Sequence, residues 1–268
     1  MKTPFWIAGI IVALTLMRAS GETQPAYSTN QPLPTIQILM PPGKGFFSKQ
    51  LDFRGIPIKA HLVVSDDALY VAYARMNLLL GHQPVIVSNL AAAKVELHII
   101  GKDQVTTDLP EWLQDKGKPL PEYQGLTRDQ RTRGMGGQLT SCGEENLLKL
   151  EKDKYFGRDI CVHEFSHAIR DYGLDEKTRA QFDEQYHRSL AKGLWTNGYA
   201  ATNPDEYFAE LSMWYFGTHG DLHMNEPKPE NGPEGLKRYD AEAYRLFDDF
   251  YSGRLLVTMP ASPIKDDN

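Results

Sequence analysis

The segment "ICVHEFSHAIRDYG", residues 160–173, contains two histidines four residues apart, and it constrains the fold more than any other part of this 268-residue chain. On an α-helix, four residues make about one turn, so His163 and His167 project from one face and can bind one zinc ion at about 2.0–2.1 Å. The flanking helical positions are apolar, namely Ile160, Val162, Phe165, Ala168 and Ile169. The sequence therefore predicts a buried helix that offers two metal ligands and ends at Gly173.

The residue after the first histidine points to catalysis rather than to a purely structural metal. Glu164 lies about 100° round the helix from His163, where it can address a water molecule on the metal instead of the metal itself. A catalytic zinc needs a third protein ligand and an open fourth position. The extended motif of the metzincins would place glycine and histidine at positions 170 and 173, but Arg170 and Gly173 stand there, which excludes that class.

A glutamate further along the chain is the other common third ligand. The segment "NPDEYFAEL" offers Glu206 and Glu210, one helical turn apart. One could bind the metal while the other accepts the free N–H of a ligand histidine. Alternatively, Glu206 could close a capping box with Asn203, and Glu210 could be a solvated helix residue. Glu184 is a rival third ligand, although its surroundings, "FDEQYHR", are typical of an exposed face.

The chain contains two cysteines, Cys142 and Cys161. In an exported protein, two cysteines most simply form one disulfide. Cys161 could instead bind metal, since it precedes His163 by two residues. A step of two on a helix turns a side chain by about 200°, which carries Cys161 away from the histidine face. We therefore favour the disulfide, which would join the segment before the motif to the start of the motif helix.

The first 21 residues, "MKTPFWIAGIIVALTLMRASG", have the layout of a secretory signal peptide. Lys2 precedes an apolar run from Phe5 to Met17, and we expect cleavage near Gly21. A retained membrane anchor is the alternative, but a run of 13 residues is too short to cross about 30 Å of hydrocarbon. We expect a secreted or periplasmic protein without stable membrane insertion after cleavage.

The remaining chain divides by composition into three parts. Residues 22–45 are rich in proline and polar residues, and we interpret them as a linker or lead-in. Residues 46–260 form the expected catalytic domain, because 41% hydrophobic residues in the chain suffice for a core, and residues 261–268 form a tail. The net charge is -6, and the sequence contains no long run of residues with the same charge, so nothing indicates nucleic acid as a partner. We expect a monomer.

The order of periodic segments predicts the fold class. Alternating patterns predict strands over residues 56–64 and 93–100, and a third over 135–141 that its glycines place at a sheet edge. The expected helices lie between Ser65 and Gly81, in the motif, after Asp175, from Pro204 onward and over residues 241–251. Strands early and helices late indicate an α+β fold, with a small mixed sheet and a helical C-terminal half that carries the motif helix.

Taken together, "HEFSHAI…Y…NPDEYFAE" resembles the zinc peptidases of the anthrax lethal factor type, which include the secreted Pro-Pro endopeptidases of bacteria. The similarity covers about fifty residues of the C-terminal half. It implies a zincin-like domain in which His163 and His167 bind zinc and Glu164 is the general base. It also implies that Glu206 is the third ligand and that Glu210 supports a ligand histidine. Residues 46–130 show no such similarity, so it implies nothing about substrate preference.

The resemblance also implies a role for Tyr199, which stands seven residues before Glu206. In that role its hydroxyl would donate to the oxyanion that forms when a zinc-activated water, deprotonated by Glu164, attacks a carbonyl. The sequence therefore predicts a secreted endopeptidase with one zinc ion per chain and a peptide or protein substrate. Two alternatives stay open: a catalytically silent zincin-fold binding module, and a zinc amidase that acts on a cell-wall crosslink.

The glycine-rich segment before the first cysteine is the expected substrate-binding edge. Zinc peptidases commonly hold an extended substrate against the edge of a sheet, where backbone hydrogen bonds give affinity. Small residues would let the two backbones approach each other closely. The expected edge consists of Gly136, Gly137, Gln138, Leu139 and Thr140.

Overall fold

The computed structural model describes residues 34–155, 157–220, 224–225 and 227–259. The chain divides into two compact units, residues 1–33 and 34–268, and all described residues belong to the second. The expected signal peptide over residues 1–21, the lead-in before residue 34 and the tail over residues 261–268 lie outside the described residues, so they stay predictions. Among the described residues, no helix is long and apolar enough to cross a membrane.

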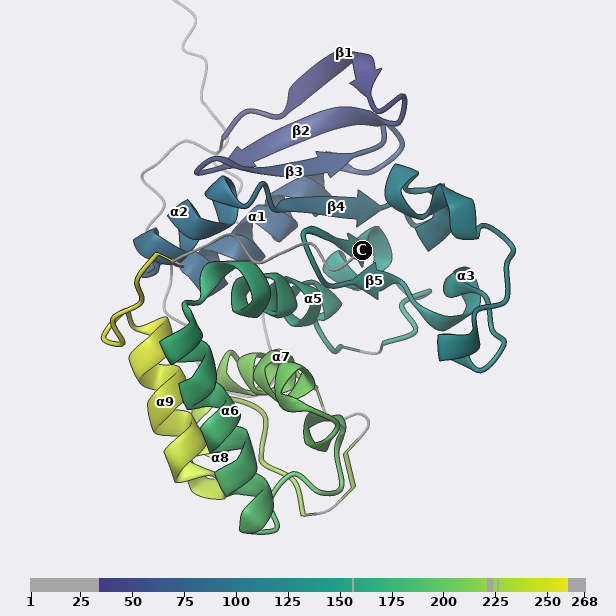
Figure 1. Ribbon diagram of the computed structural model, residues 1–268. Helices are drawn as coiled ribbons and strands as arrows, with labels where there is room; N and C mark the ends of the chain where they lie inside the picture. Colours follow the sequence, from purple (N-terminus) through teal and green to yellow (C-terminus); the bar gives the residue numbers. More distant parts are fainter. Residues whose placement is uncertain (1–33, 156, 221–223, 226, 260–268) are drawn as a thin grey trace, which may run out of the picture. The chain divides into compact units, whose positions relative to one another are not determined.

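One mixed sheet of six strands forms one side of this unit, in the order β1-β2-β3-β4-β6-β5 (Figure 1). The strands β1 to β3 are antiparallel, β4 is parallel to both β3 and β6, and β5 is an antiparallel edge strand beside β6. Their bounds are Gln37–Gly43 (β1), Phe47–Phe53 (β2), Ile56–Ala60 (β3), Glu96–Ile100 (β4), Gly134–Met135 (β5) and Leu139–Gly143 (β6).

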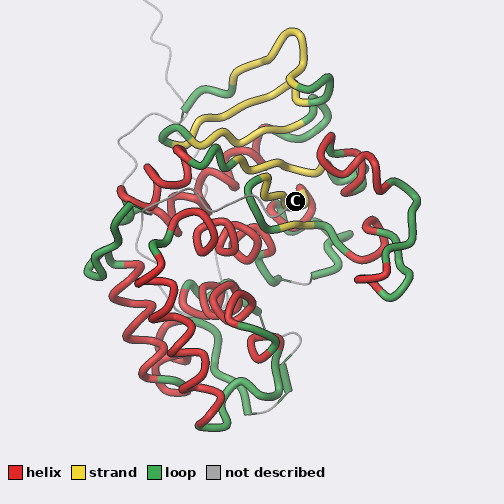
Figure 2. Tube along the Cα trace, viewed as in Figure 1, coloured by secondary structure: helices red, strands yellow, loops and turns green. Residues whose placement is uncertain are grey.

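Helices and loops make up the rest of the described unit (Figure 2), and the described residues after β6 contain helices and no further strand. The longer helices are α1 (Asp66–Leu80), α2 (Pro84–Ala92), α5 (Ile160–Ala168), α6 (Glu176–Ala191), α7 (Pro204–Tyr215), α8 (Pro233–Tyr239) and α9 (Ala241–Tyr251). Two single-turn helices are α3 (Arg128–Arg131) and α4 (Glu144–Leu147). The predicted α+β class, with a mixed sheet and a helical C-terminal half, is confirmed.

The motif helix α5 lies in the middle of the core, between the sheet and α7 (Figure 1). Its apolar residues, such as Val162 and Phe165, are buried together with α1 residues and with the inward-facing residues of β3 and β4. The alternation of β3, where Ile56, Ile58 and Ala60 are fully buried, places one face of the sheet on this core. The motif is therefore held by packing on two sides.

The predicted boundary of the folded domain at residue 46 is wrong, because residues 37–43 of the expected lead-in form β1. This strand is mostly exposed, contains Pro41 and Pro42, and pairs with β2 through its backbone. An edge strand of this kind shows no apolar alternation, and edges tolerate proline. The neighbouring β2 was not predicted either.

The expected single strand over residues 135–141 is also wrong. Met135 ends β5, residues 136–138 make a turn, and Leu139 begins β6. The turn uses Gly137 at a φ of 113°, a conformation that other residues rarely adopt. The glycines therefore mark a hairpin, of which only β5 is at the edge.

Helix ends were predicted better than strand ends. Ser65 caps α1 by accepting from the amide of Asp67, and α9 has the expected bounds of residues 241–251. The expected strands over 56–64 and 93–100 are shorter, and α2 and α8 were not predicted. The sequence of α2, "PVIVSNLAA", is apolar and rich in β-branched residues, so it gives no amphipathic helical pattern.

The two cysteines lie face to face between β6 and α5. Cys142 and Cys161 are buried free cysteines whose Sγ atoms are 2.6 Å apart. The disulfide between them stays a prediction, because the structure shows contact and no bond.

We expect the exported, purified protein to show no titratable thiol after denaturation. Reduction should lower its free energy of unfolding by about 3 kcal/mol, because a bond across 19 residues restricts the unfolded chain. Urea titrations with and without reductant measure the change, and the Cys142→Ala/Cys161→Ala double variant, which reductant should not affect, is the control. Two free thiols in the purified protein would contradict the disulfide.

A buried charged cluster lies on the other face of the sheet. His98 on β4 is fully buried, with Nδ1 2.5 Å from Glu111 and Nε2 2.8 Å from Glu96. Lys59 lies 2.6 Å from Glu96. Burial opposes charge on His98, but the two carboxylates outweigh it and raise its pKa above the ordinary value. The cluster fastens the turn that carries Glu111 to the sheet.

A histidine whose pKa rises on folding stabilises the fold below its unfolded pKa of about 6.5, and this contribution is lost as pH rises through the folded pKa. Glu96 remains charged in this window, since the histidine and Lys59 lower its pKa to about 2 against the effect of burial. We therefore expect His98→Gln to destabilise the protein more at pH 5.5 than at pH 9.5 in urea unfolding. The variant His187→Gln, at an exposed position of α6, is the control. An equal loss at both values of pH would show that His98 is not charged in the fold.

Candidate metal centre

Polar contacts at its first residues fix where α5 begins. The side chain of Asn146 accepts from the amide of Ile160 at 2.8 Å and donates to the carbonyl of Arg158 at 2.7 Å. Asp159 caps the helix by accepting from the amide of Val162 at 3.1 Å. Both side chains are buried, so the first turn has its free amides satisfied without water.

The start of α7 is fixed against α5 by a buried arginine. Arg170, in the π-helical turn that follows α5, donates to Asp205 at 2.5 Å and to Asp183 of α6 at 2.6 Å. Asn203 caps α7 by accepting from the amide of Glu206 at 2.8 Å. These contacts set the position of Glu206 relative to the histidines of α5.

Three ligand atoms meet between α5 and α7. The Nε2 atoms of His163 and His167 are 3.3 Å apart, and Oε2 of Glu206 lies 3.2 and 3.5 Å from them. A tetrahedral zinc ion with bonds of about 2.0–2.1 Å separates its ligands by about 3.3–3.4 Å. Oε2 of Glu206 is buried without a hydrogen-bond partner among the described residues. The residues present therefore fit a zinc ion.

The carboxylate of Glu206 points to the histidines and away from its own helix cap. Asn203 does cap the helix, but no returning contact from Glu206 completes a capping box. Burial alone would raise the pKa of Glu206, and the adjacent imidazoles of His163 and His167 lower it to about 2 instead. The rival Glu184 is exposed on α6 and pairs with Arg188 at 3.3 Å. Of the two candidates, the structure brings only Glu206 to the histidines.

Glu164 belongs to the same cluster, since ligand atoms of His163, Glu164 and His167 lie within 4.8 Å of one another. The carboxylate of Glu206 is nearer to both imidazoles, so we assign the third ligand position to Glu206 and leave Glu164 beside it. Burial raises the pKa of Glu164, while the neighbouring histidines act in the opposite direction. A carboxyl that accepts a proton readily is suited to a base.

Behind the histidines, Glu210 is buried among three nitrogen donors. It lies 3.1 Å from Nδ1 of His163 and 2.7 Å from Nε2 of His219, and it pairs with Arg158. These partners hold its pKa below the usual range in spite of burial. The sequence analysis missed Arg158 and His219, which come from loops on either side and follow no motif. The contact to Nδ1 leaves Nε2 of His163 directed at the metal position.

The edge strand lies directly on the motif helix because Gly134 in the strand and Gly136 just after it lack a side chain. A Cβ atom at Gly134 would lie 2.7 Å from Ile160 and 3.0 Å from Glu164, and one at Gly136 would lie 2.7 Å from His167. The glycines therefore allow the strand to pack closely on the helix. The sequence analysis had expected them to allow the close approach of a substrate instead.

The centre opens into a cleft of about 830 Å³. The part of the hairpin that lines it is residues 134–136, whereas Gln138, Leu139 and Thr140 do not line it. Leu139 and Thr140 pair with β4 inside the sheet. Of the expected substrate edge over residues 136–140, only Gly136 lines the cleft, because the hairpin turn carries the later residues back into the sheet. A substrate edge on this hairpin stays a prediction.

Tyr199 lines the cleft beside the metal ligands. It begins a short 3₁₀ turn, Tyr199–Ala201, and its hydroxyl donates to Oε1 of Glu206 at 3.1 Å. Burial and the Glu206 carboxylate raise the pKa of Tyr199 to about 12. The hydroxyl therefore keeps its proton and can donate it in a hydrogen bond.

Comparison with known proteins finds similarity at the level of structure. No protein-family profile and no curated protein sequence matches the chain. Among solved structures, the Pro-Pro endopeptidase PPEP-2 from Paenibacillus alvei is similar, with a TM-score of 0.51 and 18% sequence identity over 72% of this chain and 97% of that one. At this identity the likeness shows a shared α+β, zincin-like fold. The wider resemblance to the lethal factor type stays a prediction.

We expect Glu210→Gln to weaken zinc binding about 10- to 100-fold, because Gln lacks the negative charge that lies 3.1 Å from Nδ1 of His163 and orients the imidazole. Competition with a fluorescent chelator measures the affinity. Glu184→Gln, at the exposed position on α6, is the matched control and should bind zinc as the wild type does. Equal affinities for both variants would contradict the supporting role of Glu210.

Proposed function

We propose that this protein is an exported, zinc-dependent endopeptidase. The observation that carries the proposal is the set of separations of 3.2–3.5 Å among one carboxylate oxygen and two imidazole nitrogens at the floor of an open cleft. Two imidazoles and one carboxylate are a donor set typical of catalytic zinc. When bound, zinc supplies Lewis-acid polarisation of a carbonyl group and of a water molecule.

The chain's own groups would then move the protons. Glu164 takes the proton of the attacking water at its carboxylate and passes it to the nitrogen of the leaving amine. Tyr199 turns its hydroxyl from Glu206 toward the carbonyl oxygen of the substrate, where negative charge develops. Glu210 holds His163 in the tautomer whose Nε2 lone pair is free. Each role uses a group that the structure places at the cleft or directly behind it.

A peptide is the substrate that the cleft suits best. One side of β5 pairs with β6, and residues 134–136 line the cleft together with Glu164. An extended peptide could lie along these residues, held mainly by its own backbone. This arrangement supports peptide-bond hydrolysis at an internal position of a chain.

Two other functions compete with this proposal. A silent binding module would have no use for a base beside a three-ligand site, and a structural zinc usually has four protein ligands. A zinc amidase for a cell-wall crosslink would share every residue named above. The fold shared with an endopeptidase favours the peptidase.

The decisive experiment exposes the zinc-loaded wild type, Glu164→Gln and Tyr199→Phe to a diverse peptide pool, with mass spectrometry to identify cleaved bonds. We expect wild-type cleavage at internal bonds, a loss of about 10²–10⁴ in rate for Glu164→Gln and of about 10²–10³ in kcat for Tyr199→Phe. Both variants should retain one zinc ion per chain by elemental analysis.

The control is Tyr172→Phe, a tyrosine close to the motif in sequence that does not line the cleft. Its rate should equal that of the wild type. If Glu164→Gln cleaves as fast as the wild type, the peptidase proposal fails. If the wild type cleaves no peptide but releases products from purified cell wall, the amidase is the correct function.

A further inference from the structure

Two cationic side chains line the cleft without an ion-pair partner among the described residues. Arg131, the last residue of α3, and Lys154, in the loop between α4 and α5, both line the cleft and are exposed. Neither forms an ion pair with any residue in the described part of the chain. The only contact of the Lys154 amine among described residues is with the ring of Tyr155, at 5.4 Å.

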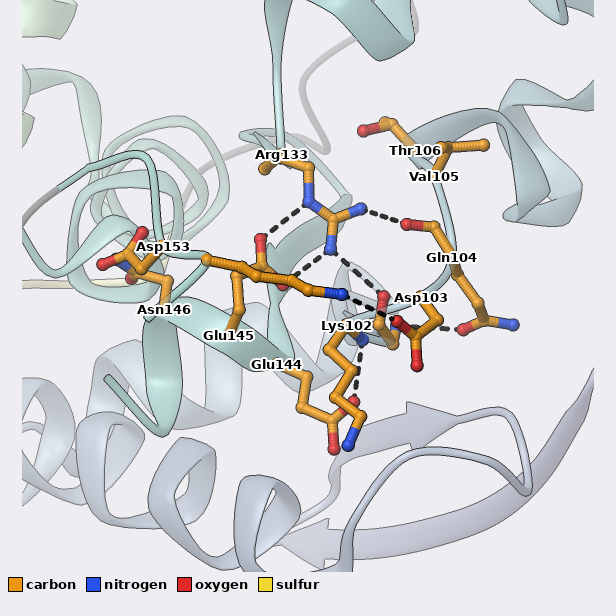
Figure 3. A network of polar contacts seen from close by, with 12 residues as sticks. Lys102, Asp103, Gln104, Val105, Thr106, Arg133, Glu144, Glu145, Asn146 and Asp153 are labelled. Carbon is orange, nitrogen blue, oxygen red and sulfur yellow. Dashed lines mark hydrogen bonds and ion pairs between the residues drawn. The ribbon is translucent and has the colours of Figure 1, made fainter. Parts of the chain in front are cut away.

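The other cations around this end are fully matched. Arg158 pairs with buried Glu210. Arg133, two residues after Arg131, donates to both oxygens of Glu145 at 2.7 and 2.6 Å and to the Gln104 carbonyl at 2.5 Å (Figure 3). Arg133 and Arg158 therefore each have a carboxylate partner, whereas Arg131 and Lys154 have none among the described residues.

The acidic residues of the cleft cannot supply the missing charge. Glu164 and Glu206 line the cleft beside the two histidines, and a divalent cation bound there would balance both carboxylates. The metal-loaded cleft would then retain the two charges of Arg131 and Lys154. Burial lowers the pKa of Lys154, the like charges of Arg133 and Arg131 act in the same direction, and Glu145 acts in the opposite one.

We infer that this end of the cleft is a carboxylate-binding subsite, so the preferred peptides carry either an acidic side chain or their own C-terminal carboxylate there. A cleft lined by charge of one sign attracts ligands of the other sign. The subsite lies beside the start of β5, since Arg131 precedes Gly134 by three residues. A peptide paired with β5 therefore passes it. The inference rests on the proposed peptidase function and specifies its substrate class.

The test uses pools of octapeptides in which one position at a time holds Asp or Asn and the others hold mixed neutral residues. Each pool is made with a free C-terminal carboxylate and with a C-terminal amide, which separates the two sources of the carboxylate. Binding to zinc-loaded Glu164→Gln is followed by the anisotropy of an uncharged fluorophore, and cleavage by the wild type by mass spectrometry.

We expect either the Asp pools to bind tighter than the Asn pools, or the free C-terminal acids to bind tighter than the C-terminal amides. The difference should be about three- to tenfold, since each exposed charge pair contributes up to about fivefold in affinity. The preference should fall as NaCl rises from 0.05 to 0.5 M. When Arg131→Gln and Lys154→Gln are both added to the Glu164→Gln protein, the ratio of affinities for the carboxylate and amide peptides should fall close to one. Lys152→Gln is the matched control, because Lys152 pairs with Asp103 at 3.5 Å and does not line the cleft. That control should keep the full ratio.

The outcomes for the two proposals are separable. Equal binding of Asp and Asn pools and of acid and amide ends, or a preference that survives the double substitution, overturns the subsite even if the wild type cleaves peptides. A carboxylate preference in binding that depends on Arg131 and Lys154, without any cleavage by the wild type, supports the subsite and overturns the peptidase function.

Discussion

The packing of α7 against α5 is the constraint on which the site depends. Oε2 of Glu206 lies 3.2 and 3.5 Å from two imidazoles of α5, and these short distances require a fixed position of α7 relative to α5. Arg170 provides it at one end by joining the π-helical turn after α5 to Asp205. Glu210 provides it one turn further along α7, through Arg158 and His163. Buried ion pairs of this kind fix geometry more reliably than they add stability.

The sequence predicted the parts of this arrangement that are local. A histidine pair one turn apart, a proline at the first position of α7 and Asn203 as its cap are all signals within a few residues, and the structure contains each of them. The ends of helices such as α1 and α9 could be predicted because capping residues are also local signals. The strands were harder, because β1 is an exposed edge and β5 has only two residues, so neither produces the alternation that marks a half-buried strand.

Contacts between distant segments were out of reach of the sequence. In the sequence, Arg170 was used only to exclude the extended metzincin motif. In the structure it donates to Asp183 of α6 and Asp205 of α7 and so joins the two helices. His219, stacked on Trp214 at 3.9 Å, and Arg158 are partners of Glu210 that no spacing rule connects to it. The glycines were recognised as sites of close backbone approach, but the sequence alone could not identify the neighbour as α5 rather than a ligand.

That close approach has a consequence for how such a centre can diversify. In the proposed peptidase, the close contact of Gly134 and Gly136 with α5 would set the depth at which a bound peptide lies above Glu164. Substitutions at the rim, as at Arg131 or Lys154, would then alter which sequences are accepted while the reacting groups stay in place. Selectivity and chemistry would thereby belong to different residues, and one could evolve without disturbing the other.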